Sequence, residues 1–365
     1  MNILFFVESG LGVGALLCDQ VASIHNCNTN TVAVASTKEQ EPNLINKLSS
    51  NGIETILLEG LENHKHLLSH AKSLRKLLKN KKFDVVHVQT NWELLLIRIS
   101  IIGLKYKPKI LYTIHSFRNN KGWFQRNIAK IVITVSLALF CDRVIAPSKY
   151  LEKEFSILQK KIYSLPLGID KDYINRGFVL PPSKLVMIYP AAFRQGKRQE
   201  MIICALEKYI RASGYNDIEL ILPGVGETME ACKRQVKNLG VEDYVEFPGY
   251  CSKSELLDYY DRSNILVCSS ISETYSQIIV EGLSLGKCII TTPVGIALDI
   301  IDNNSTGFIF TSEEELVNRL VAVWEKREQL LCICKMNYSK RTRYSWETIS
   351  KQYLEFLSSW CKCCS

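Results

Sequence analysis

Short apolar runs alternate with amphipathic stretches along the first half of the chain. The apolar runs, each followed by polar or glycine turn residues, are typical of buried strands and cover 2–7, 31–35, 53–58, 84–88, 110–114 and 143–146. Helical spacing follows the first run through Ile24 and recurs over 64–80, where the polar face is basic. Strands separated by helical segments predict a parallel sheet covered by helices.

The same alternation restarts in the second half. Further strands are predicted at 184–189, 218–223, 245–247, 265–268, 288–292 and 307–310. A helix is expected over 199–212, and a last one begins at 345. This last helix carries aromatic and apolar residues on a single stripe, at Trp346, Ile349, Tyr353 and Phe356.

The two halves are separated by 168–183, a segment that follows neither period and carries two glycines and two prolines. We therefore predict an α/β protein with two Rossmann-like domains, one over 1–170 and one over 184–344, joined by a linker at 171–183. The helix at 345–365 is expected to pack back on the first domain. Because ligands bind beyond the carboxyl ends of parallel strands, we expect the two sheets to face each other across a cleft.

The composition is ordinary for a soluble globular protein, with 47% hydrophobic and 22% charged residues in 365. No apolar run reaches the roughly 18 residues of a membrane span, and the first ten residues lack the basic region of a signal peptide. Most of the thirteen cysteines stand singly inside apolar runs, as small buried hydrophobes do. The tail thiols of Cys361, Cys363 and Cys364 are interpreted as incidental. These features predict a cytoplasmic protein.

The formal net charge of +8 is concentrated in the first half, where residues 1–170 hold 22 Lys and Arg against 13 Asp and Glu. Eight of these basic residues lie between Leu94 and Cys141, a segment without any acid, among apolar residues such as Trp123 and Ile131. Such a surface suits an anionic membrane face, so we predict peripheral membrane contact. The alternative is that the apolar residues are core and the lysines ordinary solvated charge. Nucleic acid is not expected, because the aromatic residues are not spaced as stacking platforms.

A glycine-rich turn follows the first predicted strand and resembles part of a dinucleotide site. The fingerprint G-x-G-x-x-G needs its third glycine at position 15, where this chain has Ala15 after Gly10, Gly12 and Gly14. We therefore expect no nicotinamide cofactor. A turn of this kind can still bring the backbone close to a sugar phosphate.

Two glutamates eight residues apart, Glu273 and Glu281, flank an expected helix start in the second half. Glu273 follows the strand at 265–268, and Glu281 falls within the helix. The free N–H groups and positive dipole end of a helix start suit a phosphate. Carboxylates accept strong hydrogen bonds from hydroxyls, so the combination predicts a nucleotide sugar as the ligand. The alternative is that both glutamates are solvated surface charges.

On these residues the chain resembles the GT-B glycosyltransferases of the large retaining group called family GT4, over nearly its whole length. The family's E-x7-E element is Glu273 to Glu281, and the run 281–301 matches the glycine-proline pattern that follows it. Weaker matches lie at 84–88, 113–116, 146–148 and 165–170, and in two donor-side loops at 223–227 and 247–250.

Two positions depart from the family pattern. Gln89 follows the strand 84–88 where a second histidine often stands. Ala192 occupies the position of the family's usual arginine, ahead of Lys197, which matches the phosphate-binding lysine. Arg194 is the candidate to supply the missing guanidinium. The alternative is that Arg194, Lys197 and Arg198 belong to a solvated basic turn.

The resemblance implies transfer of a sugar from a nucleoside diphosphate donor, UDP favoured and GDP possible, with the anomeric configuration retained. Glu281 is implied to bind the ribose hydroxyls and Glu273 the transferred sugar. The groups implied to stabilise the departing diphosphate are Lys197, Arg194 and the backbone N–H groups of Tyr275, Ser276 and Gln277.

The resemblance also assigns residues outside this cluster. His115 would approach the sugar from the first domain, and the Gly12 loop would contact the diphosphate when the domains close. Gly224 and Tyr250 lie in the donor-side loops. No metal and no cofactor is expected, because enzymes of this type generally need neither.

The expected acceptor is a glycan or a polyprenyl-pyrophosphate-linked glycan of a bacterial surface polysaccharide, an O-antigen (lipopolysaccharide) or capsule, reached at the inner face of the plasma membrane. Two alternatives remain open. A nucleotide-sugar 2-epimerase shares the architecture, and a non-catalytic GT-B-like binding protein would account for Ala192 in place of arginine.

Overall fold

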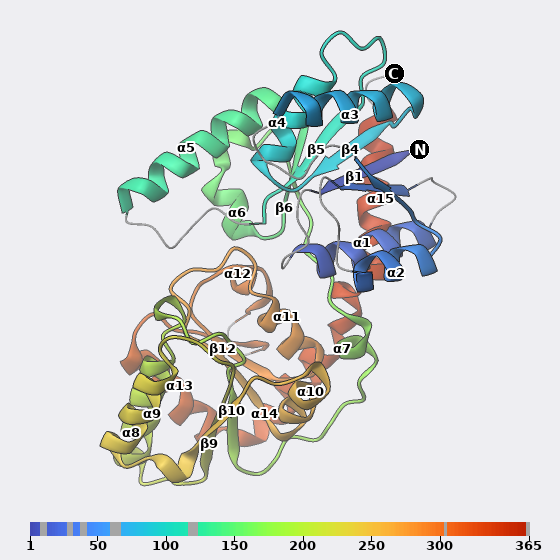
Figure 1. The fold of residues 1–365 in the computed structure, drawn as a ribbon. Helices are drawn as coiled ribbons and strands as arrows, with labels where there is room; N and C mark the ends of the chain where they lie inside the picture. Colours follow the sequence, from blue (N-terminus) through green and yellow to red (C-terminus); the bar gives the residue numbers. More distant parts are fainter. Residues whose placement is uncertain are drawn as a thin grey trace. The chain divides into compact units, whose positions relative to one another are not determined.

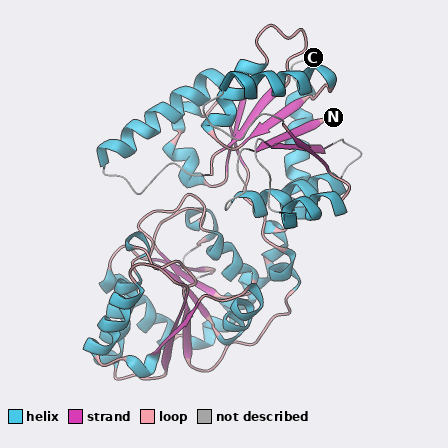
Figure 2. Ribbon diagram, in the orientation of Figure 1, coloured by secondary structure: helices cyan, strands magenta, loops and turns pink. Residues whose placement is uncertain are grey.

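The chain folds into two compact units. The computed structural model describes residues 1–7, 13–27, 32–36, 42–58, 67–115, 123–302 and 305–362. One unit consists of Met1–Gly168 together with Trp346–Ser365, and the other of Ile169–Ser345. In each unit a layer of strands lies between helices (Figures 1 and 2). Two parallel-sheet α/β units confirm the predicted fold class.

The first unit is built on a seven-stranded sheet of order β3-β2-β1-β4-β5-β6-β7, in which all neighbouring strands are parallel. Its strands are β1 (Ile3–Val7), β2 (Val32–Ser36), β3 (Glu54–Leu57), β4 (Val85–Val88), β5 (Lys109–Thr113), β6 (Arg143–Ala146) and β7 (Ile162–Ser164). Its helices are α1 (Val13–Asn26), α2 (Pro42–Ser50), α3 (Leu67–Asn80), α4 (Asn91–Ser100), α5 (Trp123–Phe140), α6 (Lys149–Glu154), η1 (Ser156–Leu158) and α15 (Trp346–Lys362). Because helices cover both faces, the central strands β1 and β4 are buried at every position.

The last helix, α15, packs against α1 in the first unit although it follows the second unit in sequence. Tyr353 of α15 lies 3.0 Å from His87 Nδ1, and His87 Nε2 lies 2.7 Å from Thr113 Oγ1. Complete burial lowers the pKa of His87 to about 3, so the imidazole is neutral. Phe356 stacks on Tyr163 with ring centroids 4.1 Å apart. The stripe expected from the sequence therefore faces the sheet of the first unit.

The second unit is built on a six-stranded parallel sheet of order β10-β9-β8-β11-β12-β13. Its strands are β8 (Leu185–Ile188), β9 (Ile218–Pro223), β10 (Val245–Gly249), β11 (Ile265–Cys268), β12 (Cys288–Thr291) and β13 (Gly307–Ile309). Its helical elements are α7 (Lys171–Asn175), η2 (Gln195–Lys197), α8 (Gln199–Ser213), α9 (Met229–Leu239), η3 (Glu242–Tyr244), α10 (Lys253–Arg262), α11 (Gln277–Ser284), α12 (Ala297–Ile300), α13 (Glu313–Glu325), α14 (Arg327–Ser339) and η4 (Arg341–Tyr344).

The boundary between the units falls after Gly168, so residues 171–183, predicted as a linker, belong to the second unit. Tyr173 of α7 packs edge-on against Tyr260, with ring centroids 6.2 Å apart. Lys253 forms an ion pair with Asp172 at 2.7 Å. An aromatic contact and an ion pair thus hold the start of this segment on the second unit.

Candidate functional site

A lysine and a glutamate meet beyond the carboxyl ends of β8 and β11, which are neighbours in the second sheet. Lys197 of η2 forms an ion pair with Glu273. Ser270 Oγ donates a hydrogen bond to the same carboxylate oxygen at 2.8 Å. The side chains of Lys197 and Glu273 are 29% and 19% exposed. The pair is therefore accessible to a ligand yet partly removed from water, where charges interact more strongly than on an open surface.

Side-chain hydroxyls hold in place the two loops that carry this pair, the loop after β8 with Lys197 and the loop after β11 with Glu273. Ser269 Oγ donates to the carbonyl oxygen of Lys197 at 2.7 Å. The Tyr189 hydroxyl donates to the same carbonyl at 3.1 Å and lies 2.8 Å from Ser270 Oγ. Both loops follow buried strands, so their anchoring hydroxyls are themselves positioned by the sheet.

Three basic residues in the turn before α8 differ in their engagement. Arg198 adopts a left-handed conformation with φ 53°, and its Nε donates to the carbonyl oxygen of Ser269 at 2.8 Å. Arg194 is exposed and forms no ion pair within the described part of the chain. Ala192, where an arginine was expected, is also exposed. Arg194 is therefore the cation of this turn that remains available beside Lys197.

The helix that carries Glu281 begins with a strained residue. Ser276, which precedes α11, has φ 67° and ψ 76°, although it is not a glycine. Its hydroxyl is buried and has no hydrogen-bond partner among the described residues. Tyr275 lies just outside the helix, where its carbonyl oxygen accepts a hydrogen bond from Ile296 N at 2.7 Å. Backbone strain of this kind concentrates at functional sites.

Glu281 lies in the second turn of α11, where its Oε2 accepts a hydrogen bond from the Tyr260 hydroxyl at 3.2 Å. Burial raises the pKa of Glu281 to about 7, and the nearby charge of Asp170 acts in the same direction. A carboxyl group with this pKa exchanges its proton near neutral pH, so a ligand that offers hydroxyl donors would select the ionised form.

The donor-side loops place Gly224 and Tyr250 differently. Gly224 has φ 140°, and a Cβ at this position would lie 2.1 Å from the carbonyl oxygen of Ala191. Its N–H donates to the carbonyl oxygen of Gly249 at 2.7 Å. Gly224 is thus required for the close approach of three loops. Tyr250, next to Gly249, is 82% exposed.

His115 belongs to the first unit, beyond the carboxyl end of β5. Its Nε2 is hydrogen-bonded to Gln89 Oε1. Burial lowers the pKa of His115 to about 4, so the ring is neutral and Nε2–H is the donor. The Gln89 Nε2 atom is buried without a partner among the described residues. The sequence did not predict this contact, although Gln89 follows β4, the neighbour of β5. Gly12 lies outside the described residues.

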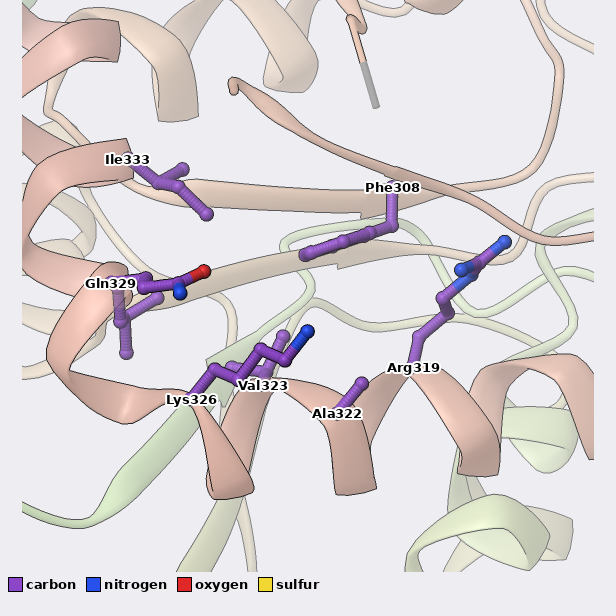
Figure 3. Close-up of a pocket in the computed structure, with 8 residues that line it drawn as sticks. Phe308, Arg319, Ala322, Val323, Lys326, Gln329 and Ile333 are labelled. Atoms are coloured by element: carbon purple, nitrogen blue, oxygen red, sulfur yellow. The ribbon is translucent and has the colours of Figure 1, made fainter. Parts of the chain in front are cut away.

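Other polar groups of the second unit do not form part of this cluster. Asp170 and Asp172, which form an Asp-Lys-Asp sequence, both pair with Lys253. Within the described ranges, no group of three or more His, Cys, Asp or Glu side chains is arranged to hold a metal ion. A pocket of about 410 Å³ lies between β13, α13 and α14, with Phe308 and Lys326 in its lining (Figure 3). None of the predicted site residues lines it.

Two family models match the chain, in stretches that overlap at residues 170–173. The model described as glycosyltransferase family 4 matches residues 31–173, and the model described as glycosyl transferases group 1 matches residues 170–339. The second match contains Lys197, Glu273 and Glu281.

Similar proteins are found among curated sequences and solved structures. The chain is 23% identical over 193 residues to N-acetyl-alpha-D-glucosaminyl L-malate synthase of Bacillus anthracis, covering 52% of this chain and 49% of that protein. It is 23% identical over 297 residues to alpha-monoglucosyldiacylglycerol synthase of Streptococcus pneumoniae, covering 73% and 66%. The crystal structure of Anabaena Alr3699/HepE in complex with UDP superposes with a TM-score of 0.79 at 18% identity, covering 98% of this chain and 100% of that one.

Proposed function

Because the chain belongs to the GT-B glycosyltransferases of the GT4 type, we propose that it transfers a hexose from a nucleoside diphosphate sugar, with retention of configuration, to a glycan or lipid-linked glycan. The observation that carries this proposal is the meeting of Lys197 and Glu273 in the unit that also holds Glu281. A cation, two carboxylates and a helix start together match the phosphates and hydroxyls of such a donor. UDP is the favoured nucleotide, since Anabaena HepE was solved with UDP and with UDP-glucose; GDP is the second choice.

The chemical difficulty of the reaction is the negative charge that builds on the departing diphosphate. Lys197 would bind the diphosphate, and Arg194, which is exposed and without an ion pair among the described residues, would add a second positive charge. The N–H groups at the start of α11 would add donors fixed in place before the reaction. Preorganised electrostatic stabilisation of this kind usually contributes more to the rate enhancement of an enzyme than any other effect.

The two glutamates would hold the hydroxyl groups of the donor. Glu281 would accept hydrogen bonds from the ribose, for which it must be ionised. Glu273 would accept hydrogen bonds from the transferred sugar, and its present partner Lys197 would turn to the phosphate when the donor binds. The leaving phosphate can take the proton of the acceptor hydroxyl, so the reaction needs no carboxylate nucleophile.

We assign His115 a role at the transferred sugar. Since its ring is neutral and Nε2–H is engaged by Gln89, it would act as a hydrogen-bonding group rather than as a cation. The acceptor side of the reaction is assigned to the unit that contains His115. We further propose that transfer needs no metal ion, so removal of divalent cations with EDTA should leave the rate unchanged.

Two similar proteins support a lipid-linked acceptor. One relative is named for the synthesis of a glycosylated diacylglycerol, and one similar structure is a lipopolysaccharide outer core galactosyltransferase. We propose a lipid-linked glycan of a bacterial surface polysaccharide, an O-antigen or capsule, as the acceptor, met at the inner face of the plasma membrane.

A non-catalytic binding protein is the second candidate, because Ala192 replaces an arginine that the family usually has. Two measurements separate the candidates. Calorimetric titration with UDP- and GDP-sugars identifies the donor, and NMR of the bound donor over hours detects its hydrolysis or transfer. Release of nucleoside diphosphate supports the enzyme, and binding without turnover against lipid-linked acceptors supports the binding protein. A change of the sugar to its 2-epimer in the same spectra would contradict both.

A further inference from the structure

Helix α5 presents apolar side chains to solvent. Five of them recur along one face and are between 47% and 67% exposed: Ile128, Ile131, Val132, Val135 and Leu139, here called the α5 ridge. Leu137, on the opposite face, is completely buried. A helix that only covers the sheet would carry polar residues at the outward positions. Figure 1 shows α5 along the outside of the first unit, with one end extending past α4 and α6.

Two further apolar side chains are exposed on segments next to α5. Ile157 of η1, which contacts α5, is 82% exposed, and Ile102 after α4 is 67% exposed. Arg98 Nε donates to the carbonyl oxygen of Phe140 at 2.5 Å, and Lys161 Nζ donates to that of Ala138 at 2.6 Å. These bonds tie α4 and the β7 region to the last turn of α5, so the apolar residues form part of one structured surface.

The charge around the ridge is positive. Lys105, Lys107 and Lys160 are exposed in the segments that flank it. Two acids near these segments are paired: Asp142 lies 3.4 Å from Arg98, and Glu154 lies 2.8 Å from Lys130. Asp84, which accepts a hydrogen bond from Tyr106 at 3.0 Å, is the acid beside Lys105 and Lys107. An apolar centre with a cationic surround is complementary to an anionic bilayer surface, whose headgroups attract lysine and whose acyl chains accept apolar side chains.

We propose that the α5 ridge docks on an anionic lipid bilayer, with its side chains inserted at the interface and the flanking lysines against the headgroups. Only the purpose of this docking rests on the proposed function, in which the bilayer would supply a lipid-linked acceptor. The sequence predicted membrane contact for the whole segment from Leu94 to Cys141. Because Leu94, Leu96 and Ile101 are buried in the core, the proposal restricts the apolar contact to the α5 ridge. No helix in the described residues is both long and apolar enough to cross a bilayer.

A second copy of the chain is a less suitable occupant. In a two-fold contact the same surface faces itself, so the flanking lysines of the two copies would repel each other. An anionic bilayer neutralises those charges. Because a bilayer is fluid, it can also adapt to the shape of the five side chains of the α5 ridge.

Vesicle flotation of the full chain tests the proposal. The vesicles contain phosphatidylcholine alone or phosphatidylcholine with phosphatidylglycerol, and the variant is Ile131→Ser with Val135→Ser. The control is Leu68→Ser, which removes a side chain that is also 69% exposed but lies on α3. We expect the wild type to float with anionic vesicles and to be released by salt. The ridge variant should lose about tenfold or more in partitioning, while Leu68→Ser behaves as wild type.

The proposal is overturned if the ridge variant floats like the wild type, or if the wild type binds neither kind of vesicle. Sedimentation without lipid adds a further decisive result: a wild-type dimer that becomes a monomer in the ridge variant would assign the surface to a second copy. Calorimetric titration of the same variants with UDP-sugar should give wild-type values. A wild type that floats but binds no nucleotide sugar would contradict the proposed function and leave the docking proposal intact.

Discussion

Lys197 and Glu273, which are 76 residues apart in the sequence, form an ion pair that joins the loops after two neighbouring strands. In the proposed function, Lys197 would bind the diphosphate of the donor and Glu273 would bind its sugar. The two charges satisfy each other, and the ion pair keeps both side chains at the carboxyl end of the sheet. The bond between sugar and diphosphate would then lie close to this pair.

Removing either member of the pair should abolish transfer. For Lys197→Ala and Glu273→Ala we expect kcat/KM to fall by about a hundredfold or more, because each removes a charge that acts on the transition state. The fold should be unaffected, since a partly exposed ion pair contributes at most about 1 kcal/mol to stability. Steady-state kinetics and thermal denaturation provide the two readouts.

Lys184→Ala is the matched control for these variants. Lys184 also pairs with a glutamate of the second unit, Glu219, but it precedes β8 rather than following it. Its loss should leave kcat/KM unchanged within about twofold. Near-normal turnover of Lys197→Ala or Glu273→Ala would show that the corresponding role is assigned wrongly.

Donor binding should depend on the ionisation of Glu281. Its pKa is raised to about 7 from an ordinary 4.5, so the donor Kd should decrease as the pH rises from 6 to 8 and then level off. Between pH 4.5 and 7 the folded state holds the proton more tightly than the unfolded state, so this group's contribution to stability decreases as the pH rises. Glu281→Gln should weaken binding and remove the pH dependence. Calorimetry at several pH values checks this, and an unchanged pH profile in the variant would refute it.

Gln89 should position His115 rather than bind the donor. Gln89→Ala removes the acceptor of His115 Nε2–H, so we expect kcat to fall by about tenfold while donor Kd stays constant. Gln89→His offers a ring nitrogen as acceptor and restores the residue common in the family, so it should recover most of the rate. Loss of donor affinity in Gln89→Ala, or failure of Gln89→His to recover more activity than alanine, argues against positioning.

Lys287 should destabilise the fold at neutral pH. Its side chain is 2% exposed, and its Nζ donates to the carbonyl oxygen of Ser263 at 2.9 Å. Burial lowers its pKa to about 8 from 10.5. The unfolded state therefore binds more protons between these values, and stability should rise with pH across this window by up to about 3 kcal/mol.

Substitution of Lys287 provides the test. Lys287→Met should raise the free energy of unfolding at pH 7, and the difference should shrink as the pH approaches 10. Urea denaturation at both pH values measures it. A variant that is less stable than wild type at pH 7 would show that the ammonium group is better satisfied than its single described hydrogen bond indicates.

Buried strands were predictable because both faces of a parallel sheet are covered. Ile265–Cys268 is an uninterrupted apolar run, and β11 has those same bounds. The strand β7 was not predicted, because Ile162–Ser164 is short and only partly buried at the sheet edge. In α5 the residues Leu137 and Leu139 are equally apolar, and only the fold determines that one is buried and the other exposed.

Candidate residues of the site could be identified from local sequence motifs. The contacts between these residues could not be predicted in this way. Glu273 and Glu281 belong to one short element that is visible in the sequence. Glu273 pairs with Lys197, and Glu281 accepts a hydrogen bond from Tyr260. Both partners come from other elements, so the ion pair and the raised pKa of Glu281 depend on packing. The same holds for His115 and Gln89, which meet because β4 and β5 are neighbours.

Isothermal titration of the full chain with UDP-sugars and GDP-sugars tests the central claim most directly. We expect one nucleotide sugar to bind per chain, and Lys197→Ala to weaken that binding by about tenfold or more while Lys184→Ala binds as wild type does. Absence of binding for every nucleotide sugar, or equal affinity in Lys197→Ala and wild type, would contradict the claim that this loop cluster holds the donor.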